Sequence, residues 1–253
     1  MLYAAAQAVW DAVSHAAARL TPDVQELHTV AAAVMDVNGN VYTGVNVHHF
    51  TGGPCAELVA LGAAAAAGAG PITEIAAIGI HPDRKGVPMA PCGRCRQILL
   101  DQQPDCNVIM PSERGLVAMP IRRLLPYSYR HPDARPARIL RFNPEHWAPV
   151  MAGAKMATTR FDDPAVVGPV TLLFEFEERY RPLPGVIDSI EPVALSDISD
   201  AQAGLEGCTA DELRRSLRTV YYPGIADNAR VDFIRFHTMP VDSGSPGAPL
   251  GAA

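Results

Sequence analysis

Two short segments constrain the fold of this 253-residue chain more than any other feature. Cys55 and Glu57 lie at the start of one Ala- and Leu-rich stretch, and Cys92 and Cys95 lie at the start of a second helical stretch. Thiolates and carboxylates are both stabilised by the positive end of a helix. If these four groups form one site, the fold must bring the N-termini of two helices together.

The hydrophobic pattern of the first half alternates between the two kinds of secondary structure. Helices are predicted over 1–19, 57–67 and 92–100, and strands over 29–35, 41–47, 75–80 and 107–110, with an Asn-Gly hairpin turn within 36–40. Such alternation is typical of an α/β layered domain.

The composition changes after residue 132. Strand-like alternation over 166–180 and 229–238 flanks a helix predicted over 209–219, which indicates an α+β domain. Thr209 and Glu212 have the spacing of a capping box for this helix. The predicted organisation is a first domain over 1–132, a Pro- and Arg-rich linker over 133–138, a second domain over 139–240 and a disordered Gly-, Pro- and Ser-rich tail over 241–253.

Charge and hydropathy exclude several classes of function. The net charge of −6 lacks the basic balance of a general nucleic-acid binder, although the Arg-rich segment 129–141 could contact phosphates. The sequence has no apolar run long enough for a membrane span, and its first helix lacks the basic start of a signal peptide, so a cytoplasmic protein is expected. Five cysteines, an odd count, favour metal ligands or catalytic groups over disulfides.

The spacing of the cysteines points to metal chemistry. The pair Cys92 and Cys95 alone could be a redox motif. With Cys55, three thiolates fill three corners of a tetrahedral Zn²⁺ site and leave the fourth for water, and Glu57 can then take a proton from that water. This C-x-E…P-C-x-x-C pattern is the three-cysteine form of the nucleobase deaminase signature. The alternative is that Cys55 is a buried apolar residue and that the other pair is incidental.

The segments "VYTGVNVHHFTGGPCAELVALGAAAAAGAG", "APCGRCRQILLDQQP" and "IRRLLPYSY" resemble the blasticidin-S deaminases of the cytidine deaminase superfamily. The resemblance covers about residues 25–130. It implies an α/β/α sandwich, a homotetramer, and hydrolytic removal of the 4-amino group of a small cytosine nucleoside. It also implies zinc ligation by the three cysteines, proton transfer by Glu57, and substrate contacts at Thr29, Arg94 and Tyr129. From charge alone, Arg94 could either offset the three thiolates or be an ordinary surface arginine.

The sequence departs from ordinary cytidine deaminases where those enzymes hold the ribose. Asn46, a predicted substrate contact, is retained, but His48 replaces the glutamate of the family pattern. Losing that acceptor is expected to weaken ribose recognition, which suits the modified sugar of blasticidin S. A substrate such as cytidine or deoxycytidine, used in salvage, stays open.

The second domain carries another set of candidate residues. Residues 139–238 resemble the ASCH family, whose fold is a PUA-like β-barrel, through G-x-K-x-x-T-x-R at Gly153, Lys155, Thr158 and Arg160. In small bacterial ASCH enzymes that hydrolyse N4-acetylcytidine, a Lys–Thr–Glu set is catalytic. The resemblance places that set on Lys155, Thr158 and Glu206, with Arg160 as a substrate contact.

Together the two domains suggest two activities on the same nitrogen atom. The second domain would remove an acyl group from N4 of a cytosine nucleoside, and the first would then convert the product to the uracil form. The alternative, from another functional class, is an RNA-associated protein whose ASCH domain binds RNA and directs the deaminase. From spacing alone, Lys155 and Thr158 could instead be an exposed lysine and a helix cap.

Overall fold

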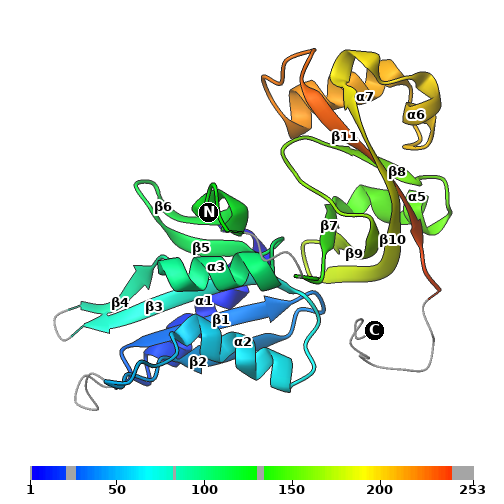
Figure 1. Ribbon diagram of the computed structural model, residues 1–253. Coiled ribbons are helices and arrows are strands. Elements are labelled where there is room, and N and C mark those ends of the chain that lie inside the picture. The colour runs from blue at the N-terminus through cyan, green and yellow to red at the C-terminus, as the bar shows by residue number, and fades with distance from the viewer. Residues whose placement is uncertain (1, 21–26, 82–83, 130–133, 241–253) are drawn as a thin grey trace. The chain divides into compact units, whose positions relative to one another are not determined.

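The computed structural model describes residues 2–20, 27–81, 84–129 and 134–240. Contacts divide the chain into two compact units, Met1–Ala137 with Glu177–Arg181, and Arg138–Phe176 with Pro182–Ser243 (Figure 1). The predicted tail over 241–253 lies outside the described residues, as does the Arg130 end of the Arg-rich segment.

The first unit is built around a six-stranded sheet. Its strands are β1 (Val30–Asp36), β2 (Val41–Val45), β3 (Ile72–His81), β4 (Arg84–Met89), β5 (Asn107–Ser112) and β6 (Gly115–Pro120), and its helices are α1 (Ala4–Ala17), α2 (Ala56–Ala66), α3 (Gly93–Gln102) and α4 (Ile121–Leu124). The order is β2-β1-β3-β5-β6, with β4 also paired with β3. The β3–β5 pair is parallel and the pairs β1–β2, β1–β3, β3–β4 and β5–β6 are antiparallel.

Both faces of this sheet are covered by helices. Successive residues of a strand point to opposite faces, so Ala31, Ala33 and Met35 of β1 pack in one cluster with α1. Ala32 and Val34 pack in the other cluster, with α2 and α3. Figure 1 shows α1 on one side of the sheet and α2 and α3 on the other. The predicted α/β/α sandwich is therefore confirmed.

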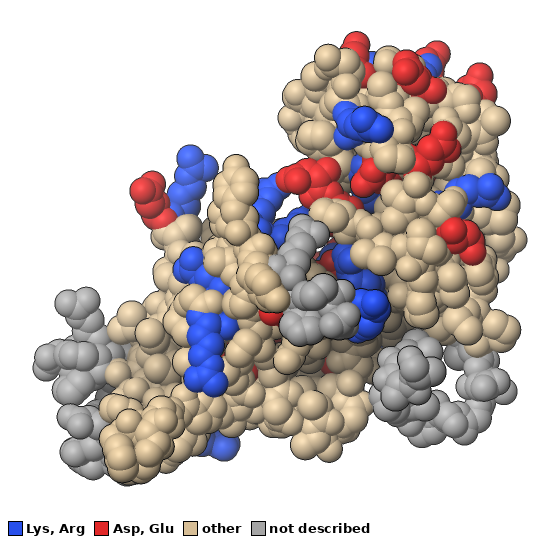
Figure 2. Space-filling model, in the orientation of Figure 1, with Lys and Arg blue, Asp and Glu red and all other residues tan. Residues whose placement is uncertain are grey.

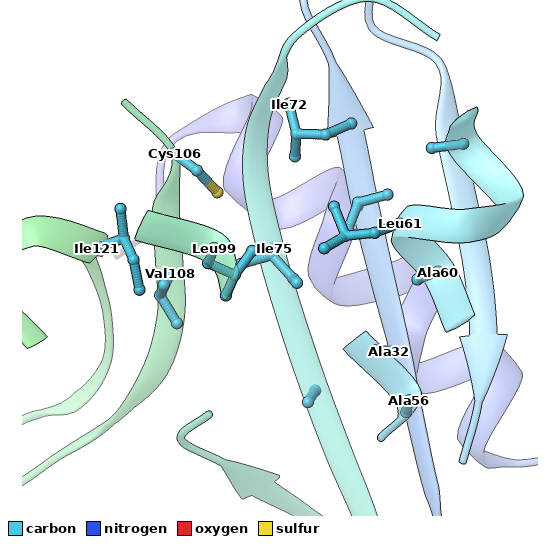
Figure 3. Close-up of a cluster of buried hydrophobic side chains, with 13 residues drawn as sticks. Ala32, Ala56, Ala60, Leu61, Ile72, Ile75, Leu99, Cys106, Val108 and Ile121 are labelled. Atoms are coloured by element: carbon cyan, nitrogen blue, oxygen red, sulfur yellow. The ribbon is translucent and has the colours of Figure 1, made fainter. Parts of the chain in front are cut away.

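The hydrophobic cluster beneath α2 and α3 fixes the positions of these two helices on the sheet. Leu61 of α2 and Leu99 of α3 approach Ile75 of β3, as Figure 3 shows. Leu99 is fully buried, and burying a leucine stabilises a fold by about 1.5–3 kcal/mol. This packing holds the N-termini of both helices on one side of the sheet.

Gly44 of β2 allows α2 to lie unusually close to the strand. A Cβ atom at this position would be 2.4 Å from the backbone nitrogen of Ala60. No larger residue fits without moving helix or strand, so the glycine sets the position of α2 and of the residues at its N-terminus.

The second unit contains an open five-stranded sheet in the order β7-β9-β10-β11-β8. Its elements are β7 (Ile139–Phe142), α5 (Trp147–Met151), β8 (Ala157–Arg160), β9 (Gly168–Glu175), β10 (Tyr180–Ala194), α6 (Asp200–Gly204), α7 (Ala210–Ser216), a π-helical turn (Leu217–Tyr221) and β11 (Arg230–Thr238). An aromatic and aliphatic core that includes Phe142, Leu172, Phe174 and Phe236 packs on the sheet.

Most of the elements expected from the sequence are present. The three helices of the first unit and the strands over 29–35, 41–47, 75–80 and 107–110 correspond to observed elements. The capping box of α7 is confirmed, because Thr209 Oγ1 accepts from Glu212 N and the Glu212 carboxylate accepts from Thr209 N. The sequence did not predict strands β4, β6, β7, β8 and β10 or the short helices α4, α5 and α6. Within the described residues, none of the helices combines the length and apolar character needed to cross a bilayer.

Candidate functional site

The fold brings the three predicted zinc ligands together. Cys55 directly precedes α2, Cys92 directly precedes α3, and Cys95 lies in the first turn of α3. Their Sγ atoms all lie within 4.8 Å of one another, and Sγ of Cys55 is 3.8 Å from Sγ of Cys92. Sulfur ligands about 2.3 Å from a tetrahedral zinc ion lie about 3.8 Å apart. The spacing therefore fits a zinc ion bound by three thiolates.

The local environment opposes ionisation of two of these three thiols. Burial and then the Glu57 carboxylate raise the pKa of Cys95, and burial raises the pKa of Cys55. Burial also works to raise the pKa of Cys92, but hydrogen bonds from the Cys95 backbone and from the other two thiols outweigh it and lower that pKa. A bound cation displaces protons from such thiols. Without one, three thiolates would repel each other and Glu57.

Glu57 is in place for proton transfer beside the cluster. It lies in the first turn of α2 and is 7% exposed. With Cys55, Cys92 and Asn46 it lines a cavity of about 250 Å³. The cavity thus holds a candidate metal site and a candidate base on one wall.

The backbone of the loop before α2 depends on Gly53. A Cβ atom there would lie 1.7 Å from the carbonyl oxygen of Val47. Gly53 and Val47 both line the cavity. Glycine therefore lets this loop close tightly next to Cys55.

The other predicted residues of the first site are placed differently. Asn46 lines the cavity, but its Oδ1 accepts the backbone N–H groups of Thr29 at 2.7 Å and Val30 at 2.8 Å. Thr29 is outside the cavity lining. Arg94 donates to the Gly53 carbonyl at 3.5 Å, and Tyr129 is 68% exposed; neither side chain lines the cavity.

A second cavity, of about 380 Å³, lies within the other unit. Lys155 Nζ donates to Glu206 Oε2 at 2.8 Å, and the two side chains are only 4% and 6% exposed. The backbone brings them together, because the Met156 N–H donates to the carbonyl of Leu205 at 2.8 Å. The predicted lysine and glutamate therefore form a buried ion pair in the cavity wall.

Two adjacent threonines of β8 line this cavity. Sequence reasoning singled out Thr158, but it is Thr159 Oγ1 that donates to Glu206 Oε1, at 2.6 Å. Thr158 is buried and contributes to the lining. Spacing within the motif gave no sign of Thr159, since only the folded position of Glu206 reveals its partner.

Arg160 also lines the cavity, yet much of its charge is used inside the protein. Its guanidinium donates to the carbonyl of Arg141, lies 3.8 Å from the Asp163 carboxylate and stacks over the Phe142 ring at 5.3 Å. The predicted substrate contact is therefore also a packing residue.

His146 and Tyr221 are cavity residues that the sequence did not indicate. His146 Nε2 is 3.4 Å from the Tyr221 hydroxyl, which also accepts from Asn143 Nδ2 at 3.2 Å. Burial, then the Lys155 charge, lowers the pKa of His146. Tyr221 ends a π-helical turn, a local irregularity that often accompanies functional sites.

Known proteins match both parts of the chain. Blasticidin-S deaminase of Bacillus cereus is 33% identical over 109 residues, which cover 40% of this chain and 77% of that protein. A crystal structure of cytidine deaminase from Burkholderia pseudomallei covers 49% of this chain and 98% of its own at 29% identity, with a TM-score of 0.40. An ASCH domain from Lactobacillus crispatus covers 36% of this chain and 68% of its own at 12% identity, with a TM-score of 0.33. No protein-family model matches the chain.

Proposed function

The chain belongs to the blasticidin-S deaminase family through its N-terminal half, and from this membership we propose that it is a zinc-dependent hydrolytic deaminase of cytosine nucleosides. The homology supports a hydrolytic deaminase in general. The convergence of three thiols within 4.8 Å of one another, with the buried Glu57 in the same cavity, carries the rest of the proposal.

Each residue of the cluster has a defined task. Cys55, Cys92 and Cys95 would hold the zinc ion. When bound, zinc lowers the pKa of a water molecule and so supplies a strong nucleophile at neutral pH. The Glu57 carboxylate accepts one proton of the attacking water and delivers it to N3 of the ring, and it then carries the proton of the resulting hydroxyl group to the amino group on C4. The C4–N4 bond breaks, oxygen replaces nitrogen on C4, and ammonia leaves.

The described lining of the cavity lacks the full set of side chains with which ordinary cytidine deaminases hold the ribose, which favours a substrate with a modified sugar. His48 offers no carboxylate, and Asn46 Oδ1 already accepts two backbone hydrogen bonds. Blasticidin S-like nucleosides fit this arrangement, which would make the activity one of antibiotic resistance, while cytidine and deoxycytidine are the salvage alternative. Thr29, Arg94 and Tyr129 remain predicted substrate contacts from the family resemblance.

The test is a product assay by mass spectrometry with cytidine, deoxycytidine and blasticidin S. Glu57→Gln should reduce ammonia release by at least about 10²-fold while zinc stays bound, because a positioned general base contributes 10²–10⁴-fold. Glu113→Gln, on the exposed turn between β5 and β6, is the matched control and should match wild type. Full activity of Glu57→Gln would refute the assignment. The relative kcat/KM values separate resistance from salvage.

A second activity is proposed for the second unit because Lys155 and Glu206 form a buried ion pair in a cavity that Thr158 also lines. This activity is hydrolysis of an N4-acylated cytosine nucleoside. Water adds across the amide, the acyl C–N4 bond breaks, and a carboxylic acid and the free cytosine nucleoside leave. The product is a substrate for the first site.

The deacylase assay uses N4-acetylcytidine in a Glu57→Gln background, so that the cytidine formed persists. Lys155→Ala should abolish its formation. Lys85→Ala changes the other lysine of the chain and is the matched control. Equal cytidine formation by the Lys155→Ala variant would eliminate this second activity.

The RNA-associated alternative has less support. The cationic side chains in the second cavity are paired within the protein: Lys155 with Glu206, Arg141 with Glu175 at 2.5 Å, and Arg160 with Asp163. On the face of the second unit in Figure 2, acidic and basic side chains are interspersed among the described residues. Salt-dependent binding of RNA would restore this alternative.

By the family resemblance, we also propose a cytoplasmic homo-oligomer, namely a tetramer.

A further inference from the structure

The carboxylate of Glu206 is held at both of its oxygen atoms. Lys155 Nζ donates to Oε2 at 2.8 Å and Thr159 Oγ1 donates to Oε1 at 2.6 Å. Thr159 is 5% exposed, and both partners of the ion pair are also buried. In such surroundings a charge-assisted hydrogen bond is stronger and more directional than one in water.

Thr158 differs from Thr159 in its hydrogen bonding. Thr158 Oγ1 makes no hydrogen bond with any residue that the structure describes, although Thr158 is only 6% exposed and is among the residues that line the cavity. Thr159, and not Thr158, is therefore the threonine that holds the Glu206 carboxylate.

Thr158 and Thr159 are paired with Ile234 and Phe233 of β11. The antiparallel ladder therefore fixes the backbone at both positions. Loss of the Thr159 hydroxyl would leave the strand in place, but Glu206 would lose the bond that fixes its second oxygen atom.

We infer that Thr159 is a positioning residue that fixes the Glu206 carboxylate against Lys155, whereas Thr158 keeps the role in the catalytic set that the family resemblance implies. The inference rests on the proposed deacylase activity. Thr159 acts through Glu206 and does not touch the substrate. Misplacing a catalytic group by about 1 Å can cost on the order of 10²-fold in rate.

The experiment measures acetate release from N4-acetylcytidine by the full chain as wild type, Thr159→Val, Thr159→Ser and Thr158→Val. Valine keeps the shape of threonine and removes the donor, whereas serine keeps the donor. Thr159→Val should lower kcat by about 10- to 100-fold with KM within about twofold of wild type, and Thr159→Ser should stay close to wild type. Thr158→Val should fall to the level of Lys155→Ala.

In a Trp10→Phe background, fluorescence of Trp147, which packs edge-on against Phe174 at 5.0 Å, reports whether the second unit is folded in each variant. If Thr159→Val keeps the wild-type kcat, Thr159 is only a packing residue and the inference fails. If Thr159→Val is inactive while Thr158→Val stays active, the roles are reversed and the inference also fails. A wild type that releases no acetate instead removes the proposed deacylase activity itself, together with this inference.

Discussion

The buried pair of Lys155 and Glu206 allows a quantitative test of the second unit. Substitution of Lys155 with methionine, which has a similar length and no charge, removes the cation 2.8 Å from Glu206 Oε2. The Glu206 side chain is 6% exposed and, among the described residues, keeps the Thr159 hydroxyl as its donor. The folded state must then hold an uncompensated carboxylate.

The cost follows from the loss of one charge of a buried pair. Removing one member of a buried ion pair typically costs about 3–5 kcal/mol. Lys155→Met should therefore destabilise the second unit by about 3–5 kcal/mol at pH 7.

The assay is urea unfolding of the full chain, followed by tryptophan fluorescence. The chain has two tryptophans, so a Trp10→Phe background leaves Trp147 of the second unit as the only reporter. The double variant Lys155→Met/Glu206→Gln is the control, because its amide still accepts from Thr159 and carries no charge. Its stability should lie closer to that of the Trp10→Phe background than the stability of Lys155→Met alone does.

A penalty below about 1 kcal/mol at pH 7 would refute the buried ion pair from which this estimate starts. So would a double variant that is as unstable as Lys155→Met alone.

Three further predictions concern other parts of the chain. Gly44→Ala should lower the unfolding free energy of the first unit by at least about 2 kcal/mol, measured by Trp10 fluorescence in a Trp147→Phe background, because its Cβ would overlap the backbone of Ala60; an unchanged stability would contradict the close packing. The lowered pKa of His146 means that the unfolded chain binds a proton more readily than the folded one. Wild type should therefore lose stability relative to His146→Gln between pH 7 and pH 5. A stability difference between these two proteins that is independent of pH would contradict this prediction. Thr209→Ala should cost about 1 kcal/mol through loss of the α7 capping box, and Thr219→Ala, beyond that helix, should cost less.

The first site was largely predictable because its chemistry depends on local sequence. Helix N-termini follow from composition, and the signature places Cys55 and Glu57 on one helix and Cys92 and Cys95 on another. The fold then only had to bring two helix starts together. That the Oδ1 atom of Asn46 is used by the backbone was not predictable, because its partners, Val30 at the start of β1 and Thr29 just before it, are 16 and 17 residues away.

The second unit was less predictable because its strands contain residues that usually mark turns. Strand β10 runs from Tyr180 to Ala194 through Pro182, Pro184 and Pro192, which hide it from pattern rules. In the first unit, β4 is hidden in the same way by Gly86 and Pro88.

The role of Thr159 illustrates a different limit of sequence analysis. Its partner, Glu206, is 47 residues away in the sequence, and the contact depends on the backbone bond between Met156 and Leu205. A local motif can indicate which residue types are needed, but it does not show which of two adjacent hydroxyls faces a distant carboxylate.

The central claim is that three cysteines hold the zinc ion of a cytosine nucleoside deaminase. The most direct measurement determines zinc per chain and ammonia release together, on the same purified samples of wild type, Cys95→Ser and the control Cys208→Ser, with cytidine, deoxycytidine and blasticidin S. Wild type and Cys208→Ser should each carry about one zinc ion and release ammonia from at least one substrate, and Cys95→Ser should lose both. Ammonia release by zinc-free wild type, or none from any substrate by zinc-loaded wild type, would contradict the claim.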